Sequence, residues 1–585
     1  MESTTSNDFF KSNVLGHPAG LFVLFFTEMW ERFSFYGMRV LLINFLTMAI
    51  VSENPGWGWS AENAGALYGT YAMLLYITPI FGGILADRYI GYRWAVVIGS
   101  IIMTLGHASM AVETELSLYV GLGLLVIGTG FFKPNMTSIL SEMYKDHSDK
   151  KDGAYTIFYM GVNAGAFFGM MLCGYLAENV GWSYGFGLAG VFMLFGTLQF
   201  WFAKPLFGKI GEVPSKEERL AAEENARTST RAEDKRNPFT LVDKILIAVT
   251  TVVGLLYAFN DPLSKIGDFN IFDFRVNDID GQNIVVLGAL ILFLILVISR
   301  VARYTTVIRD RMIAVIIFAF FTVFFWMSFE QGASSLVLFA RDNVDRSLEG
   351  SSLTIFNIVN TLLTLVPLII ITYVLILLAK QTWHKIPISN VVLAICFIGV
   401  WAVALWMLYN YFTAVESEIT VSWFSILNSF FIIAFASSVS KVWDSKYNPS
   451  AAVKYGLGLI IMAIGFGLLA FGSYGVVEGV KVSMIWLVLA YLFHTLGELC
   501  LSPVGLSYVS KLVPGRMIAF MFGMWYLAIA IGNKLAAILG GQIENITKEY
   551  SLSTFFLIFT IVPITAGIAV MLLNPVLKKL MHGVH

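Results

Sequence analysis

The chain is a succession of long apolar runs separated by short polar segments. A helix that spans a bilayer needs about 20 mostly apolar residues, and sixteen runs approach or exceed that length. They cover residues 21–50, 62–85, 94–112, 118–141, 154–177, 184–203, 244–260, 284–302, 312–338, 352–379, 389–411, 420–440, 452–473, 484–509, 517–541 and 553–574. The pattern predicts an all-α polytopic membrane protein of about 16 spans.

One long charged segment interrupts this series at residues 204–243. Six spans precede it, and its stretch KEERLAAEENAR alternates in charge sign, which is typical of a solvated helix. The interruption predicts an amino-terminal six-helix bundle at 1–203 and a linker with two extra transmembrane helices at 204–308. A carboxy-terminal six-helix bundle is expected at 309–580.

Lys and Arg gather in the short loops on one side of the predicted spans. These loops contain Arg88, Arg93, Lys145, Lys150, Lys151, Arg300, Arg311, Lys380, Lys385, Lys441, Lys446, Lys511, Arg516, Lys578 and Lys579. The opposite loops carry acids, such as Glu53, Glu113 and Glu416. Because basic loops stay on the cytoplasmic side, this alternation predicts that both termini are cytoplasmic.

Composition agrees with a membrane protein. Hydrophobic residues make up 57% of the chain and charged residues 13%, whereas a soluble protein carries about 25% charged residues. Mean hydropathy is +0.74. The net charge of −1 does not indicate a nucleic-acid partner. Cys173, Cys396 and Cys500 all lie in apolar runs, which predicts buried thiols rather than disulfides.

The first span carries four charges, on Glu28, Glu31, Arg32 and Arg39. A charge at the centre of a bilayer costs about 2.5–3.5 kcal/mol on insertion scales, so it rarely persists without a partner or a polar cavity. On a helix, Tyr36 shares a face with Glu28, Arg32 and Arg39. This face predicts a hydrated pathway or a binding site. An ion-pair cluster that only holds helices together is the alternative.

Two further spans of the amino-terminal part carry polar residues. Lys133 lies in an apolar run just before a proline, where a lone lysine often extends to the membrane surface. The acids of the first span could pair with it instead. Tyr159 and Asn163 lie one turn apart among small residues, as substrate ligands or as hydrogen-bonding groups between helices.

The apolar runs of the carboxy-terminal part also contain polar and aromatic candidate residues. Glu330 lies one turn after Trp326, and Trp525 is either a site residue or a core aromatic. Lys534, later on the same span as Trp525, is expected to extend to the outer surface.

His494, Glu498 and Ser502 form one stripe on a predicted helix. His494 and Glu498 have metal-ligand spacing, but two ligands make a poor site and nothing nearby completes the set. We therefore expect no metal and interpret His494 as a hydrogen-bonded core histidine.

Four motifs together resemble the proton-dependent oligopeptide transporter family of the major facilitator superfamily, in a bacterial member. They are EMWERFSFYG at 28–37, FYMGVNAG at 158–165, FKPN at 132–135 and GELCLSPVGLS at 497–507. The six-plus-six arrangement and the stretch GGILADRYIGYR at 82–93 are similar to the superfamily as well, with the stretch expected in a cytoplasmic loop. The resemblance implies two six-helix bundles, alternating access, and uptake of di- and tripeptides with protons.

The resemblance also implies roles for individual residues. Glu28, Glu31, Arg32, Lys133 and Glu330 would couple transport to protons. Arg39 and Lys133 would bind the peptide carboxylate, and Glu498, Asn163 and Asn428 the amino end. The side-chain pockets would be lined by Tyr36, Tyr76, Tyr159, Trp326, Ser502 and Trp525. No cofactor is implied, and the expected state is a monomer in the bacterial inner membrane.

The chain departs from the family pattern in three places. Phe35 replaces a tyrosine, Thr129 lies where asparagine is common, and Asn428 is not followed by proline. The runs 352–379 and 389–411 are interpreted as a helix pair inserted, at about 350–413, between the seventh and eighth core helices.

The sequence is also compatible with other functions. The same coupling acids would serve a transporter of nitrate or a small organic anion, although Glu498 suits a substrate with an ammonium group. A sensor without transport activity is a further alternative. A membrane-embedded enzyme needs a nucleophile–base pair or a metal cluster, and the chain contains neither HExxH nor GxSxG.

Overall fold

The computed structural model describes residues 13–145, 147–213, 239–443, 445–446, 448–477, 479–512 and 518–583. Fourteen of its helices are long and apolar enough to cross a membrane. The charged helix α2 and the 19-residue helix α4 lie at two further predicted spans. The predicted polytopic all-α fold is confirmed. The expected helix KEERLAAEENAR lies outside the described residues.

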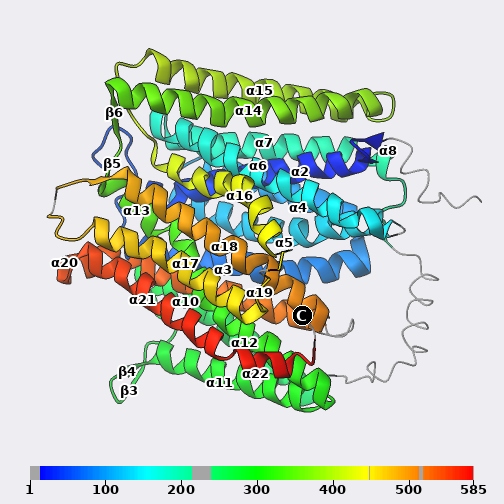
Figure 1. Cartoon of the computed structure of the whole chain (residues 1–585), viewed down its shortest axis with the longest axis vertical. Coiled ribbons are helices and arrows are strands. Elements are labelled where there is room, and N and C mark those ends of the chain that lie inside the picture. Colours follow the sequence, from blue (N-terminus) through cyan, green and yellow to red (C-terminus); the bar gives the residue numbers. More distant parts are fainter. Residues whose placement is uncertain are drawn as a thin grey trace, which may run out of the picture. The chain divides into compact units, whose positions relative to one another are not determined.

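The helices follow one another in the order shown in Figure 1. Their bounds up to the linker are α2 (Ala19–Thr47), α3 (Ala61–Leu85), η1 (Ala86–Ile90), α4 (Tyr92–Met110), α5 (Glu115–Met143), α6 (Ser148–Asn179), α7 (Trp182–Phe202) and α8 (Lys204–Phe207). After the linker come α10 (Leu241–Ile266), α11 (Gly281–Ala302), α12 (Thr306–Phe329), η3 (Glu330–Ala333), α13 (Ser335–Asp342), α14 (Gly350–Thr382), α15 (Pro387–Thr413), α16 (Val421–Trp443), α17 (Ala451–Gly472), α18 (Met484–Leu512), α19 (Ile518–Gly541), α20 (Ile543–Glu549), α21 (Leu552–Leu572) and α22 (Asn574–Leu580).

Short antiparallel strand pairs close three of the connections. They are β1 (Asn13–Val14) with β2 (His17–Pro18), β3 (Arg275–Val276) with β4 (Ile279–Asp280), and β6 (Ser347–Glu349) with β7 (Glu416–Glu418). The remaining strands are β5 (Val344–Asp345) and β8 (Val482–Ser483).

The chain forms two compact units. The first contains residues 1–57, 77–215 and 337–433, and the second contains 58–76, 216–336 and 434–585. The domain boundaries expected at residues 203 and 308 stay a prediction. In the second unit, α17 packs against α18 and α21, and α12 packs against α19.

In the first unit, α2 packs between α6 and α7. Small residues on α6 permit the close approach: a Cβ at Gly165 would lie 2.9 Å from the Cβ of Arg32. On the other side, Ser34 Oγ donates a hydrogen bond of 2.6 Å to the carbonyl of Ala189 in α7. Because both neighbours fix α2, the charged side chains on this helix are held in defined positions.

We expect Gly169→Ala to destabilise this packing. A Cβ at Gly169 would lie 2.7 Å from the Cα of Phe33, so backbone must move. Overpacking of this kind costs about 1–3 kcal/mol, and we expect a lower Tm in detergent. Gly123→Ala is the matched control, because nothing lies within 4 Å of that Cβ. Equal Tm values for the two variants would contradict the packing described here.

The predicted inserted helices are α14 and α15, which form an antiparallel pair covering α7 in the first unit (Figure 1). Ser389 Oγ donates a hydrogen bond of 2.8 Å to the carbonyl of Gln199. The Phe397 ring lies 5.4 Å from Trp30 and 5.6 Å from Phe26. The insertion therefore packs directly on the helix that carries the charge cluster.

The span predicted at 312–338 is broken in the structure. Helix α12 ends at Phe329, and the 3₁₀ turn η3 separates it from α13. The side chain of Gln331 donates to the carbonyls of Met327, at 3.1 Å, and Ala536, at 2.9 Å. Irregular backbone at membrane depth is tolerated where it is buried in protein or lines a cavity. Glu330 lies at this break.

Candidate functional site

A buried ion cluster lies in the middle of α2. Glu28, Glu31 and Arg32 are 3%, 0% and 7% exposed. Arg32 Nε lies 2.8 Å from Glu28 Oε1 and 3.0 Å from Glu31 Oε2, so one guanidinium contacts both acids. Neither Glu31 oxygen accepts a hydrogen bond from the described residues. Arg32 Nε donates a hydrogen bond to Glu28 and holds Glu31 by charge, so protonation of either acid would weaken the cluster.

Two further cations surround this cluster. Lys133 of α5 interacts electrostatically with Glu28, Glu31 and Arg39. Arg39 lies 5.7 Å from the Tyr36 ring, and Arg32 lies 5.8 Å from the ring of Phe35, the residue that departs from the family pattern. The structure thus brings together the charged residues of the first and fourth predicted spans.

The other candidates of the first unit lie on α6 and α16. Asn163 is buried, and its side-chain amide donates a hydrogen bond of 3.0 Å to the carbonyl of Tyr159. The Tyr159 side chain is exposed, and Asn428 is half-buried.

In the second unit, Glu330 is buried and Trp326 is half-buried at the end of α12. Trp525 is buried, and its ring lies 6.4 Å from that of Tyr455. Tyr76 of α3 stacks on Tyr526 of α19, with ring centroids 6.4 Å apart. Trp525 therefore has the surroundings of a core aromatic.

The three residues of the predicted stripe on α18 differ in their exposure to solvent. Glu498 and Ser502 are half-buried, whereas His494 is buried and its ring lies 4.3 Å from that of Phe466. His494 Nε2 has no hydrogen-bond partner among the described residues, so this nitrogen departs from the expected hydrogen-bonded histidine.

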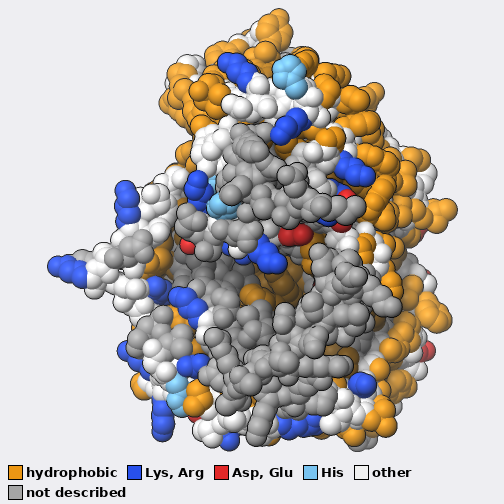
Figure 2. Space-filling model, turned by 90° about the vertical axis from the view of Figure 1, so that its right-hand side faces the viewer, with side chains coloured by type: hydrophobic (Ala, Val, Ile, Leu, Met, Phe, Trp, Pro, Cys, Tyr) orange, Lys and Arg blue, Asp and Glu red, His pale blue; other side chains and the backbone are white. Residues whose placement is uncertain are grey.

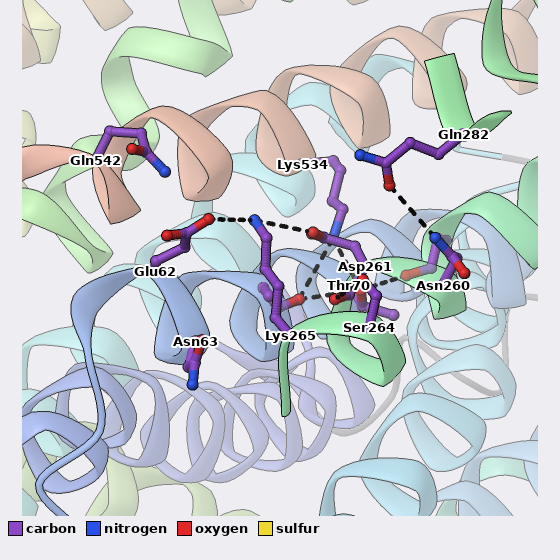
Figure 3. A network of polar contacts seen from close by, with 12 residues as sticks. Glu62, Asn63, Thr70, Asn260, Asp261, Ser264, Lys265, Gln282, Lys534 and Gln542 are labelled. Atoms are coloured by element: carbon purple, nitrogen blue, oxygen red, sulfur yellow. Dashed lines mark hydrogen bonds and ion pairs between the residues drawn. The ribbon is translucent and has the colours of Figure 1, made fainter. Parts of the chain in front are cut away.

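The expectation for Lys534 was wrong. Its side chain is 4% exposed, and its ammonium lies 2.5 Å from Asp261 Oδ2 (Figure 3). Asp261 directly follows the run predicted at 244–260, but α10 extends past that end to Ile266 and includes it. A hydrogen-bond acceptor inside the protein removes the need for Lys534 to reach the surface. The sequence signal was an acid just after one apolar run and a lysine inside another.

Arg93, expected in a loop, lies in the first turn of α4. It is 7% exposed, and its guanidinium lies 2.6 Å from Glu212 Oε1 and donates to the carbonyl of Gly208. Residues Gly82 to Leu85 continue α3, so only part of the stretch GGILADRYIGYR forms the connection.

At the start of α2, outside the spans, His17 Nδ1 lies 2.8 Å from the Tyr144 hydroxyl. Burial and the nearby charge of Lys150 lower the pKa of His17. Burial raises the pKa of Tyr144. Both effects favour the neutral pair, which fixes the segment before the charged helix.

Long apolar helices that carry buried ion clusters are typical of transporters, and the class of this protein is a multi-pass membrane transporter. The model of the POT family matches residues 93–410 and 390–558. The chain belongs to the POT family, which confirms the resemblance carried by the four motifs.

Individual relatives match over nearly the whole chain. A peptide transporter of Yersinia enterocolitica, YePEPT, is 30% identical, covering 97% of this chain and 96% of its own. A di-/tripeptide transporter of Lactococcus lactis is 28% identical, with 97% of each chain covered. A solved structure of a POT peptide transporter with sulfate has a TM-score of 0.70 at 27% identity, covering 99% of this chain and 100% of that one.

Proposed function

We propose that this protein imports di- and tripeptides together with protons by alternating access. The observation that carries the proposal is the buried cluster of Glu28, Glu31 and Arg32 in a chain of the POT family. A proton that neutralises either acid would weaken its hold on Arg32 and so bias the conformational equilibrium. The names of the relatives support peptide as the substrate class.

For the substrate, we assign the two peptide termini to fixed charges. Arg39 and Lys133 bind the carboxylate, while Glu498 binds the ammonium group with help from Asn163 and Asn428. Tyr36, Tyr76, Tyr159, Trp326 and Ser502 contact the peptide side chains. Fixed charges for the termini and aromatic walls for the rest suit a site that accepts many peptides.

For the orientation, we propose a bacterial inner-membrane monomer with both termini in the cytoplasm. Among the described side chains on the face seen in Figure 2, Lys and Arg are prominent and Asp and Glu are sparse. An apolar surface flanks this face on the right of the view. Basic residues favour the cytoplasmic side of a membrane.

Uptake of a labelled dipeptide into proteoliposomes tests the proposal. We expect accumulation only with an inward proton gradient, and competition by unlabelled dipeptides. Uptake of nitrate or an organic anion, but not of peptide, by the same folded protein would overturn it.

Glu498→Gln should weaken binding of peptides with a free amino end, because an amide cannot offset the ammonium charge. A charge-assisted hydrogen bond contributes about 1.5–3 kcal/mol, so we expect KM to rise about tenfold or more. Competition assays with a dipeptide and its N-acetylated form measure the effect, and the acetylated form should lose little. Equal losses for both ligands would contradict the assignment of Glu498.

A further inference from the structure

A second buried ion group lies in the second unit, on helices other than α2. The Lys534 ammonium contacts Asp261 Oδ2 at 2.5 Å, and it donates to Thr70 Oγ1 at 2.9 Å and to the carbonyl of Ala66 at 3.3 Å (Figure 3). Thr70 Oγ1 in turn donates to the carbonyl of Ala258 at 2.7 Å. One ammonium therefore joins three helices: α19, α10 and the first half of α3.

An outer pair continues this group. Lys265 Nζ lies 3.1 Å from Asp261 Oδ1 and 3.2 Å from Glu62 Oε1 (Figure 3). The side chains of Lys265 and Glu62 are 26% and 38% exposed, against 4% and 12% for Lys534 and Asp261. Exposed ion pairs contribute little to stability, whereas breaking a buried ion pair is strongly destabilising. The buried ion pair between Lys534 and Asp261 therefore contributes most to the stability of this group.

Small residues bring α3 and α19 into close contact beneath this ion group. A Cβ at Gly65 would lie 2.6 Å from the carbonyl oxygen of Ala537, and one at Gly69 would lie 2.6 Å from the Ala537 Cβ. The two helices therefore meet through close backbone packing as well as through the polar contacts of the ion group.

Helix α3 belongs to both units. Residues up to Tyr76 group with the second unit, and residues from Ile77 group with the first. Pro79 lies within the helix just beyond this division. A proline there removes one backbone hydrogen bond and permits bending. Pro79 therefore marks the point at which a bend would separate the two halves of α3.

We propose that Asp261 and Lys534 form a latch that holds the first half of α3 against α19 and α10. On the proposed function, on which this inference rests, the latch is closed when the outer side is closed and opens when peptide enters. Asp261 and Lys534 are positioning residues in the transport cycle. The hairpin α10–α11 is then part of the moving machinery, because it supplies the acid.

Hydrogen bonds of Asn260 fix the end of α10, where Asp261 lies. The Asn260 side-chain oxygen accepts a hydrogen bond of 2.6 Å from the Ile271 amide, and its amide nitrogen donates to Gln282 at 3.3 Å. These contacts join the end of α10 to α11, immediately beside Asp261.

Spin labels at Ser60→Cys and Asn545→Cys, before α3 and in α20, measure opening in nanodiscs. Both sites are exposed, and the three native cysteines are buried. Asp261→Asn leaves the Lys534 charge without its counter-ion, so we expect the ratio of long to short distances to rise about tenfold. Driven uptake should fall in Vmax with little change in KM. Asp261→Glu should recover both readouts in part.

The matched control is Asp280→Asn on the same hairpin, where the ion pair with Arg275 is 49% exposed at the acid. It should leave both readouts unchanged. The double variant Asp261→Asn with Lys534→Met removes both charges, so we expect folding to be restored without recovery of the distance ratio. Unchanged distances in folded Asp261→Asn would overturn the latch. Absence of peptide uptake by the unmodified protein would instead overturn the proposed function, while the distance shift would still test the latch.

Discussion

Glu330→Gln is expected to abolish proton-driven accumulation of dipeptide and to leave counterflow exchange intact. The acid is buried at the break between α12 and η3, where the neutral amide keeps the shape but cannot take up and release a proton. Each pH unit of gradient is worth about 1.4 kcal/mol, about tenfold accumulation for each accompanying proton. Proteoliposomes of the variant should show no accumulation above the equilibrium level.

The matched control is Glu416→Gln, the same substitution at an exposed acid in β7. It should accumulate peptide like the unmodified protein. Exchange distinguishes lost coupling from lost binding, because exchange needs the loaded carrier only. Concentrative uptake by Glu330→Gln would remove this residue from the coupling mechanism, and loss of exchange would assign it to peptide binding.

Arg32→Met is expected to abolish transport and to destabilise the fold. It removes the cation that lies within 3.0 Å of both buried acids. Breaking a buried ion group by removing one partner costs about 3–5 kcal/mol. Thermal unfolding in detergent should show a large drop in Tm. Arg32→Lys should recover part of the stability, because an ammonium keeps the charge but not the planar guanidinium.

Charge balance gives a sharper test of the same site. Adding Glu28→Gln to Arg32→Met removes one of the two acids that lose the guanidinium, so Tm should recover in part while transport stays absent. Arg275→Met, which breaks an ion pair whose arginine is 74% exposed, is the control and should change neither. If the combined variant is no more stable than Arg32→Met alone, the acids are not held by charge.

The spans could be predicted from the sequence because each is a local apolar pattern. The run predicted at 350–413 became α14 and α15, and the linker helices began close to their predicted residues. The acids and bases of α2 were also visible, since a charge in an apolar run needs a local reason.

Pairing between distant segments could not be predicted in this way. Asp261 and Lys534 are 273 residues apart in the chain. Hydropathy treats each as a helix-end charge near water, and periodicity does not indicate which helices meet. The break at Glu330 could not be predicted for the same reason. It involves a contact between distant segments, because the side chain of Gln331 donates a hydrogen bond to the carbonyl of Ala536 on another helix.

The packing of α14 and α15 on α2 has one more consequence. Leu368 and Ile371 of α14, with Phe397 of α15, line a small apolar pocket together with Trp30 and Phe33. Acyl chains would otherwise compete for this surface, and their length and fluidity vary with growth conditions. Here α2 contacts side chains of the same protein instead of lipid. The surroundings of the charged helix on that side therefore depend on the amino-acid sequence and not on the composition of the membrane.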